Sequence, residues 1–289
     1  MKANLLETIG VLLLKKGYTL KCLTRTCFDI LARKEDKILL IKVLEDANAV
    51  SQEYAQQMRN LSFYIDASPI IIAEKAGARL EDYVIYSRFD IYTLNLATFS
   101  NCLENRFPFA RRSQAGLTVS VIGRKMREMR EQLGYSLNSL SKKLGVSSRM
   151  ISKYETEDAK VTLKRAMRIY DVFGAAVFDK INVFSSKPKA ANPCRSDVSR
   201  KYVELGFDAA ETRNVPFNVI ARKEKEIILT GLGDKPNPQA ASMSKLIDAD
   251  NLMIFTKKKP KEIPALTKQE FLEFEKANEL IKFVKEFRK

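Results

Sequence analysis

Histidine is absent from this chain of 289 residues, and cysteine occurs four times. Without histidine, the chain has no Ser-His or Cys-His pair for nucleophilic catalysis and no histidine ligand for a metal. The cysteines, Cys22, Cys27, Cys102 and Cys194, contain no C-x-x-C spacing, so they predict neither a zinc site nor a redox pair. We therefore expect no metal, no cofactor and thiols that stay reduced, as in a cytosol.

Long apolar runs are missing as well. No run approaches the ~18 residues that a membrane span needs, and the N-terminus lacks the layout of a signal peptide. We expect a soluble, cytoplasmic protein with no membrane partner. The length predicts two or three domains, and a hydrophobic content of 45% gives each of them a core.

Acidic residues are scarce only in the middle of the chain. Residues 1–110 hold 14 basic and 13 acidic side chains, residues 111–200 hold 19 and 8, and residues 201–289 hold 17 and 14. Most of the net charge of +15 therefore belongs to the central segment. A DNA duplex, with one negative charge per ~1.7 Å of axis, is the natural partner. The alternative, a basic surface kept for solubility, would be spread more evenly.

Two short amphipathic helices are predicted in this segment, at 137–144 and 148–154. Their apolar positions recur at helical spacing: Leu137, Leu140, Leu144, Ile151 and Tyr154. Ser136 and Ser147 each stand before a helix as N-cap candidates, and Gly145 suits a left-handed C-cap. A small bundle could show such leucines by chance, but it would not place these capping residues between them. The pattern indicates a helix-turn-helix.

Further helices predicted at 121–133, 162–173 and 176–181 complete an all-α bundle of five helices. The segment resembles the Cro and phage-repressor type of helix-turn-helix domain. The residues that carry the resemblance are Leu140, Leu144-Gly145-Val146-Ser147, Ile151-Ser152 and Tyr154-Glu155. One departure is Thr156-Glu157-Asp158, which stands where a glycine turn is usual. Its negative charges would face a DNA backbone poorly.

The resemblance implies two sets of DNA contacts. The residues expected to read base edges in the major groove are Ser148, Arg149, Ser152 and Lys153. The residues expected to hold backbone phosphates are Arg124, Lys125, Asn138, Lys142 and Lys143. Because one such helix reads only a few base pairs, we expect a homodimer on two half-sites about one turn of DNA apart.

The segment before residue 110 predicts a small α/β domain. Its expected elements are a helix ending at Gly17, strands 27–33 and 37–43, helix 51–64, strands 69–73 and 83–94, and helix 98–104. Residues 37–43 form a nearly continuous apolar run, which is typical of a strand covered on both faces.

The same pattern returns near the other end of the chain. Residues 17–40 align without gaps on residues 206–229, with eight identities that include Phe28 with Phe217 and Leu40 with Leu229. We interpret this as a duplicated domain that ends in a helix at 267–287; a chance likeness of two hairpins is the alternative. The predicted domains are residues 1–110, 118–182 and 200–289, with a linker at 183–199 that is rich in Ser, Lys, Pro and Ala.

The first α/β segment resembles nucleases of the restriction-endonuclease and Holliday-junction-resolvase type in Glu7, Asp29 and Lys42. Those enzymes hold Mg²⁺ between two carboxylates, one of them two residues before the lysine. Here that position is Leu40, and the second copy has Ser196, Asn218, Leu229 and Gly231. We expect an inactive, degenerate nuclease fold that serves dimerisation, DNA wrapping or effector sensing; an unrelated small α/β domain is the alternative.

The order of the three domains resembles archaeal HTH-type transcriptional regulators. The sequence therefore predicts a sequence-specific DNA-binding regulator of transcription that is not an enzyme. Two alternatives stay open. One is a coactivator or adaptor that docks onto the basal transcription machinery, and the other is a nuclease directed at DNA junctions or ends.

Overall fold

The computed structural model describes residues 2–113, 116–186, 188, 194–260 and 263–287. They form two compact units. Unit 1 comprises residues 1–73, 89–91 and 184–289, and unit 2 comprises residues 74–88 and 92–183. The chain passes from one unit to the other within strands β4 (Ala67–Ala76) and β7 (Ile91–Leu94), and also between residues 88 and 89 and between residues 183 and 184.

The first half of unit 1 is a helix, three antiparallel strands, a second helix and a further strand. Its elements are α1 (Lys2–Lys15), β1 (Thr19–Cys22), β2 (Ile30–Lys34), β3 (Lys37–Asp46), the 3-10 turn η1 (Ala47–Ala49), α2 (Gln52–Tyr64) and β4. The strands lie in the order β1-β2-β3-β4. In β3, Leu39, Leu40 and Ile41 are all fully buried, so this strand is covered on both faces. Helix α1 buries Leu5, Ile9 and Leu13.

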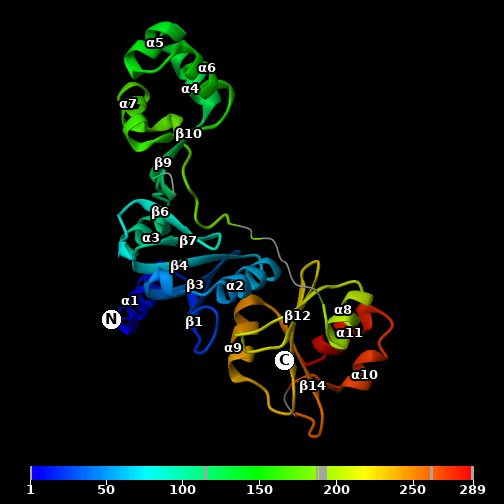
Figure 1. The fold of residues 1–289 in the computed structure, drawn as a ribbon. Helices are drawn as coiled ribbons and strands as arrows, with labels where there is room; N and C mark the ends of the chain where they lie inside the picture. The colour runs from blue at the N-terminus through cyan, green and yellow to red at the C-terminus, as the bar shows by residue number, and fades with distance from the viewer. Residues whose placement is uncertain (1, 114–115, 187, 189–193, 261–262, 288–289) are drawn as a thin grey trace. The chain divides into compact units, whose positions relative to one another are not determined.

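The second half of unit 1 repeats this arrangement, drawn from yellow to red in Figure 1. Its elements are α8 (Asp197–Glu204), β11 (Asp208–Glu211), β12 (Val219–Lys223), β13 (Glu226–Leu232), α9 (Pro238–Ile247), β14 (Asp250–Phe255), β15 (Ala265–Thr267), α10 (Lys268–Leu272) and α11 (Ala277–Lys285). The sheet has the order β11-β12-β13-β14-β15. Tyr202, Phe271 and Leu280 bring α8, α10 and α11 into one core with the strands.

Residues 189 positions apart take the same places in the two halves. The pair Leu31 and Leu40 in the β2–β3 ladder corresponds to Ile220 and Leu229 in the β12–β13 ladder. Side chains follow the same rule. Lys34 donates to the carbonyl of Lys16 at 2.9 Å, and Lys223 donates to the carbonyl of Leu205 at 3.1 Å.

The two halves also contact one another reciprocally. Arg33 donates to the carbonyl of Leu246 and pairs with Asp248, at the end of α9. Arg222, its counterpart, donates to the carbonyl of Tyr64 and pairs with Asp66, at the end of α2. Helix α9 packs on β1 and β2, while α2 packs on β12. Each half thus closes the helix end of the other with an arginine.

Unit 2 carries the basic central segment. Its elements are β5 (Ala78–Arg79), β6 (Val84–Arg88), α3 (Leu96–Leu103), β8 (Ala110–Ser113), β9 (Gly116–Val121), α4 (Gly123–Gln132), α5 (Leu137–Leu144), α6 (Ser148–Thr156), β10 (Ala159–Thr162), α7 (Leu163–Phe173) and the 3-10 turn η2 (Gly174–Val177). Helices α4 to α7 appear in green in Figure 1, next to β9 and β10.

The expectation of an all-α bundle of five helices is wrong. Strand β9 pairs antiparallel with β8 and with β10. The helix expected at 176–181 is replaced by η2 and a bridge between Val121 and Phe178. The physical reason is that the amides of Asp179 and Ile122 bond to carbonyls of Ser120 and Val177, so this stretch completes a ladder and not a helix. Four α-helices remain among the described residues of 116–183.

Two expected boundaries in the last third also change. The helix expected at 267–287 is two helices, α10 and α11, because Lys276 has an extended backbone (φ −130°, ψ 139°) and starts a new helix as its N-cap. In the expected linker 183–199, positions 187 and 189–193 lie outside the described residues, and α8 already begins at Asp197. The N-cap of α8 is Ser196.

Candidate nucleic-acid interface

Helices α5 and α6 are delimited by the capping residues Ser136, Gly145 and Ser147. Ser136 accepts the amide of Ser139 at 3.0 Å, and Ser147 accepts the amide of Met150 at 3.2 Å. Gly145 has a φ of 65°, which a residue with a Cβ rarely adopts. Helix α6 extends to Thr156, two residues beyond the expected end.

The apolar faces of these helices share one core. Leu140, Leu144 and Ile151 are buried, together with Met126 of α4 and Ile169 of α7. The partly buried Val146 packs against this cluster from the turn. Because the inner faces are used for packing, only the opposite sides of α5 and α6 are available to a partner.

The four expected base-reading residues are not equivalent in the structure. Arg149 and Lys153 are exposed, and among the described residues neither has a hydrogen bond or ion pair through its side chain. Ser152 is half-buried. Ser148 is also half-buried and donates to Ser141 Oγ at 3.2 Å, which ties α6 to α5. Within the described part of the chain, the two cations, one helical turn apart, are therefore both exposed and unpaired.

The expected phosphate-holding residues differ in the same way. Lys125, Lys142 and Asn138 are exposed. Arg124 lies 3.6 Å from Glu128 across one turn of α4. Lys143 donates to the hydroxyl of Tyr135 at 3.0 Å and lies 5.2 Å from the centre of its ring.

Sequence reasoning missed an internal ion pair between α4 and α6. Arg130 Nε lies 2.6 Å from Glu155 Oε1, and Arg130 Nη2 lies 3.0 Å from Glu155 Oε2. The two side chains are 11% and 5% exposed. The hydrogen bonds to Glu155 raise the pKa of Arg130 above its ordinary value. Arg130 also donates to the carbonyl of Tyr135.

Other arginines of this segment are likewise committed to the fold. Arg165 donates to the hydroxyl of Tyr154 at 3.0 Å, and Arg168 donates to the carbonyl of Leu144 at 3.2 Å. Net charge alone therefore overstates the cationic surface that a partner would meet. The local sequence pattern could not have shown that these arginines bond within the fold, because their partners lie 11 and 24 residues away.

The acidic turn after α6 also has an internal role. Asp158 accepts the amide of Gly123 at 3.1 Å, at the first residue of α4. A carboxylate stabilises this end of a helix because the free amides carry partial positive charge. Gly123 itself is required, since a Cβ there would lie 2.5 Å from the carbonyl oxygen of Tyr154.

The nuclease-like position in unit 1 holds a lysine pair around one aspartate. Asp29 Oδ2 accepts the amide of Val43 at 2.7 Å, and Oδ1 lies 3.2 Å from Lys2 Nζ and 3.4 Å from Lys42 Nζ. Leu40 is fully buried, and Glu7 is exposed.

These residues do not fit a divalent cation. Mg²⁺ binds through carboxylate and other oxygen ligands, whereas Asp29 is already bonded to two ammonium groups and an amide. Nowhere in the described part of the chain do three or more His, Cys, Asp or Glu side chains gather as they would around a metal.

Comparison with known proteins agrees with both domain types. Residues 2–108 match the PD-(D/E)XK superfamily domain, and residues 126–176 match the helix-turn-helix family. The chain thus combines a nuclease-type fold with a helix-turn-helix. No solved structure matches the chain. None of the described helices is long and apolar enough to cross a membrane.

Relatives match over most of the chain. A protein of Archaeoglobus fulgidus is 30% identical over 99% of this chain and 98% of its own length, and one of Methanosarcina barkeri is 32% identical over 81% and 78%. One of Thermococcus kodakarensis is 27% identical over 100% and 97%. All three are named, provisionally, HTH-type transcriptional regulatory proteins. The chain belongs to this archaeal family of HTH-type transcriptional regulatory proteins.

Proposed function

We propose that this protein is a sequence-specific DNA-binding regulator of transcription that reads the major groove with α6. The observation that carries the proposal is the outer face of α6, where Arg149 and Lys153 are exposed and have no partner among the described residues, while Ile151 on the inner face is fully buried. Arginine and lysine donate hydrogen bonds to the O6 and N7 atoms of guanine. Lys125, Lys142 and Asn138 would hold backbone phosphates and set the register.

A dimer on two half-sites about 34 Å apart would supply the length of sequence that one helix cannot read. Its first test is selection of bound sequences from a random duplex pool with the full-length protein at near-physiological salt. Recovery of a palindrome with half-sites one turn apart is the expected result. Binding without any motif, fading as salt rises, would contradict sequence-specific reading.

The register of α6 is tested by two matched substitutions. Arg149→Ala should weaken binding to the selected site by about 1–3 kcal/mol and relax the preference at one base position. Lys142→Ala should weaken binding to all duplexes alike. It should also reduce the number of ions released on binding, measured from the salt dependence, by about one. Both are measured by titration of selected and scrambled duplexes. If Arg149→Ala leaves both affinity and preference unchanged, α6 does not read the site in this register.

We further propose that the nuclease-like halves of unit 1 are duplicated scaffolds without hydrolytic activity. The support is that Asp29 is bonded to lysines on the first copy, and that Asn218 takes its place on the second. Incubation of the protein with junction, flapped and blunt duplexes and Mg²⁺ should leave them intact. Cutting that requires Mg²⁺ and is abolished by Asp29→Ala would overturn this part of the proposal.

A second candidate function is docking onto the basal transcription machinery. It is favoured by an apolar stripe on α7, where Leu163, Met167 and Tyr170 are 39%, 62% and 56% exposed. These positions are four and three residues apart and therefore lie on one side of the helix. Binding to a general transcription factor without any preferred DNA sequence would place this function first.

A further inference from the structure

The second half of unit 1 contains a cavity of about 270 Å³ at the position of the nuclease-type site. Asn218, Leu229 and Gly231 line it, and they stand where the first half has Asp29, Leu40 and Lys42. In the first half the Lys42 side chain is 12% exposed and reaches the carbonyl of Thr26. Gly231 has no such side chain, and a Cβ there would lie 2.5 Å from Met253 Sδ, so Met253, which also lines the cavity, occupies that side of Gly231.

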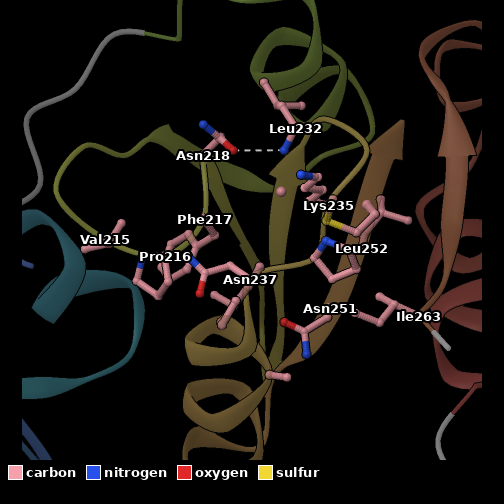
Figure 2. A pocket seen from close by; sticks show the side chains of 16 residues that line it. Val215, Pro216, Phe217, Asn218, Leu232, Lys235, Asn237, Asn251, Leu252 and Ile263 are labelled. Carbon is pink, nitrogen blue, oxygen red and sulfur yellow. Dashed lines mark hydrogen bonds between the residues drawn. The ribbon is translucent and has the colours of Figure 1, made fainter. Parts of the chain in front are cut away.

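The walls of the cavity come from three parts of the second half. Figure 2 shows Val215, Pro216 and Phe217 on one side and Leu252 and Ile263 on the other. Ala240 and Ala241, at the start of α9, add small side chains. Asn218 is held in place because its Oδ1 accepts the amide of Leu232 at 2.8 Å, the dashed line in Figure 2.

One polar atom of the cavity wall lacks a partner. Asn251 Oδ1 is buried and accepts no hydrogen bond in the described structure. Its orientation is fixed by Ser244, whose hydroxyl donates to the carbonyl of Ala241 and so can only accept from Asn251 Nδ2. Leaving a buried acceptor unpaired costs folding free energy, which a ligand with an N–H or O–H group would recover.

The charge of the cavity wall is positive. Lys235 is the one charged side chain among the described lining residues, which include no aspartate or glutamate. It forms no ion pair within the part of the chain that the structure describes. The neighbouring Asp234 is turned away, because it accepts the amides of Thr256 and Lys257 at 2.8 and 2.9 Å. A ligand with a negative group would therefore meet Lys235 without competition.

We propose that this cavity binds a small α-amino or α-hydroxy carboxylic acid. The carboxylate would pair with Lys235, the amino or hydroxyl group would donate to Asn251 Oδ1, and an apolar side chain would contact Phe217 and Met253. The volume lies just below the range of about 300–1,000 Å³ that is typical of ligand pockets, which suits a compact molecule. The binding site is independent of the proposed reading of DNA.

Calorimetric titration of the full-length protein with each of the twenty L-amino acids and their α-hydroxy analogues tests this directly. At least one of them should bind. For the tightest binder, the matched acid without the α-substituent and the matched amide without the carboxylate should each bind at least about ten times more weakly, a loss of 1.4 kcal/mol. If no acid binds, or if both matched compounds bind as tightly as the acid itself, the proposal is wrong.

Three variants place the ligand in the cavity. Lys235→Gln should weaken binding several-fold, whereas Lys245→Gln, which removes an exposed charge of α9 outside the lining, should not. Ala240→Leu should abolish binding by filling the cavity from a helix that tolerates leucine. Circular dichroism establishes that each variant is folded. Unchanged binding in folded Ala240→Leu protein would overturn the assignment of the site.

Discussion

Removal of Glu155 should destabilise the helix-turn-helix selectively. The carboxylate forms two hydrogen bonds with Arg130, and the side chains are 5% and 11% exposed. Breaking a buried pair by removing one partner costs about 3–5 kcal/mol, because the remaining charge stays buried. We expect about 3 kcal/mol for Glu155→Leu, since Arg130 keeps its bonds to the carbonyl of Tyr135 and to Glu131.

Hydrogen exchange of the full-length protein measures this effect where it occurs. A loss of about 3 kcal/mol should make the slowest amides of α4, α5 and α6 exchange roughly 100 times faster, since 1.4 kcal/mol is a factor of ten. The control is Glu128→Gln, which removes the partner of Arg124 in a pair that is 84% and 56% exposed. It should leave these amides almost unchanged.

The double variant Arg130→Met with Glu155→Leu separates a buried charge from lost packing. Replacing both members of a buried pair by apolar groups is often close to neutral. Exchange in the double variant should therefore be slower than in Glu155→Leu alone. Exchange as fast as, or faster than, in the single variant would refute the reasoning, and so would a single variant that behaves like wild type.

Two glycines and one aspartate give further predictions. Gly123→Ala should speed exchange in α4 and α6, because its Cβ would meet the carbonyl oxygen of Tyr154 at 2.5 Å; Gly10→Ala, with open space in α1, should instead raise the melting temperature. Hydrogen bonds from the Lys257 amide and its neighbours lower the pKa of Asp234 to about 2. Its stabilisation is thus complete above its ordinary pKa and is lost as pH falls through about 2. Carboxyl NMR of wild type against Asp234→Asn should show this midpoint, and a midpoint near 4 would contradict it.

Elements with local signals were predictable. Ser136 and Ser147 mark the starts of α5 and α6 by accepting amides three residues away, and the amide of Gly145 marks the end of α5 by donating to the carbonyls of Ser141 and Lys142. The repeat was also visible, because the same ladder requires the same residues at the same spacing in both halves.

Elements that depend on distant partners were not predictable. Strand β9 pairs with β10 about 40 residues later, and the end of β9 also bonds to residues 177–179, where a helix was expected. The ion pair of Arg130 was not predictable for the same reason, because its partner Glu155 lies 25 residues further along the chain.

By itself, the sequence determined the helix-turn-helix, its capping residues and its outward cations. All of these follow from side-chain chemistry and from spacings shorter than about two helical turns. Only the tertiary structure decided which cations remain available on α6, and that a cavity lies beside Asn251 in the second half of unit 1. The exposure of a side chain and the volume of a cavity depend on how segments distant in sequence pack together. A local sequence pattern does not predict that packing.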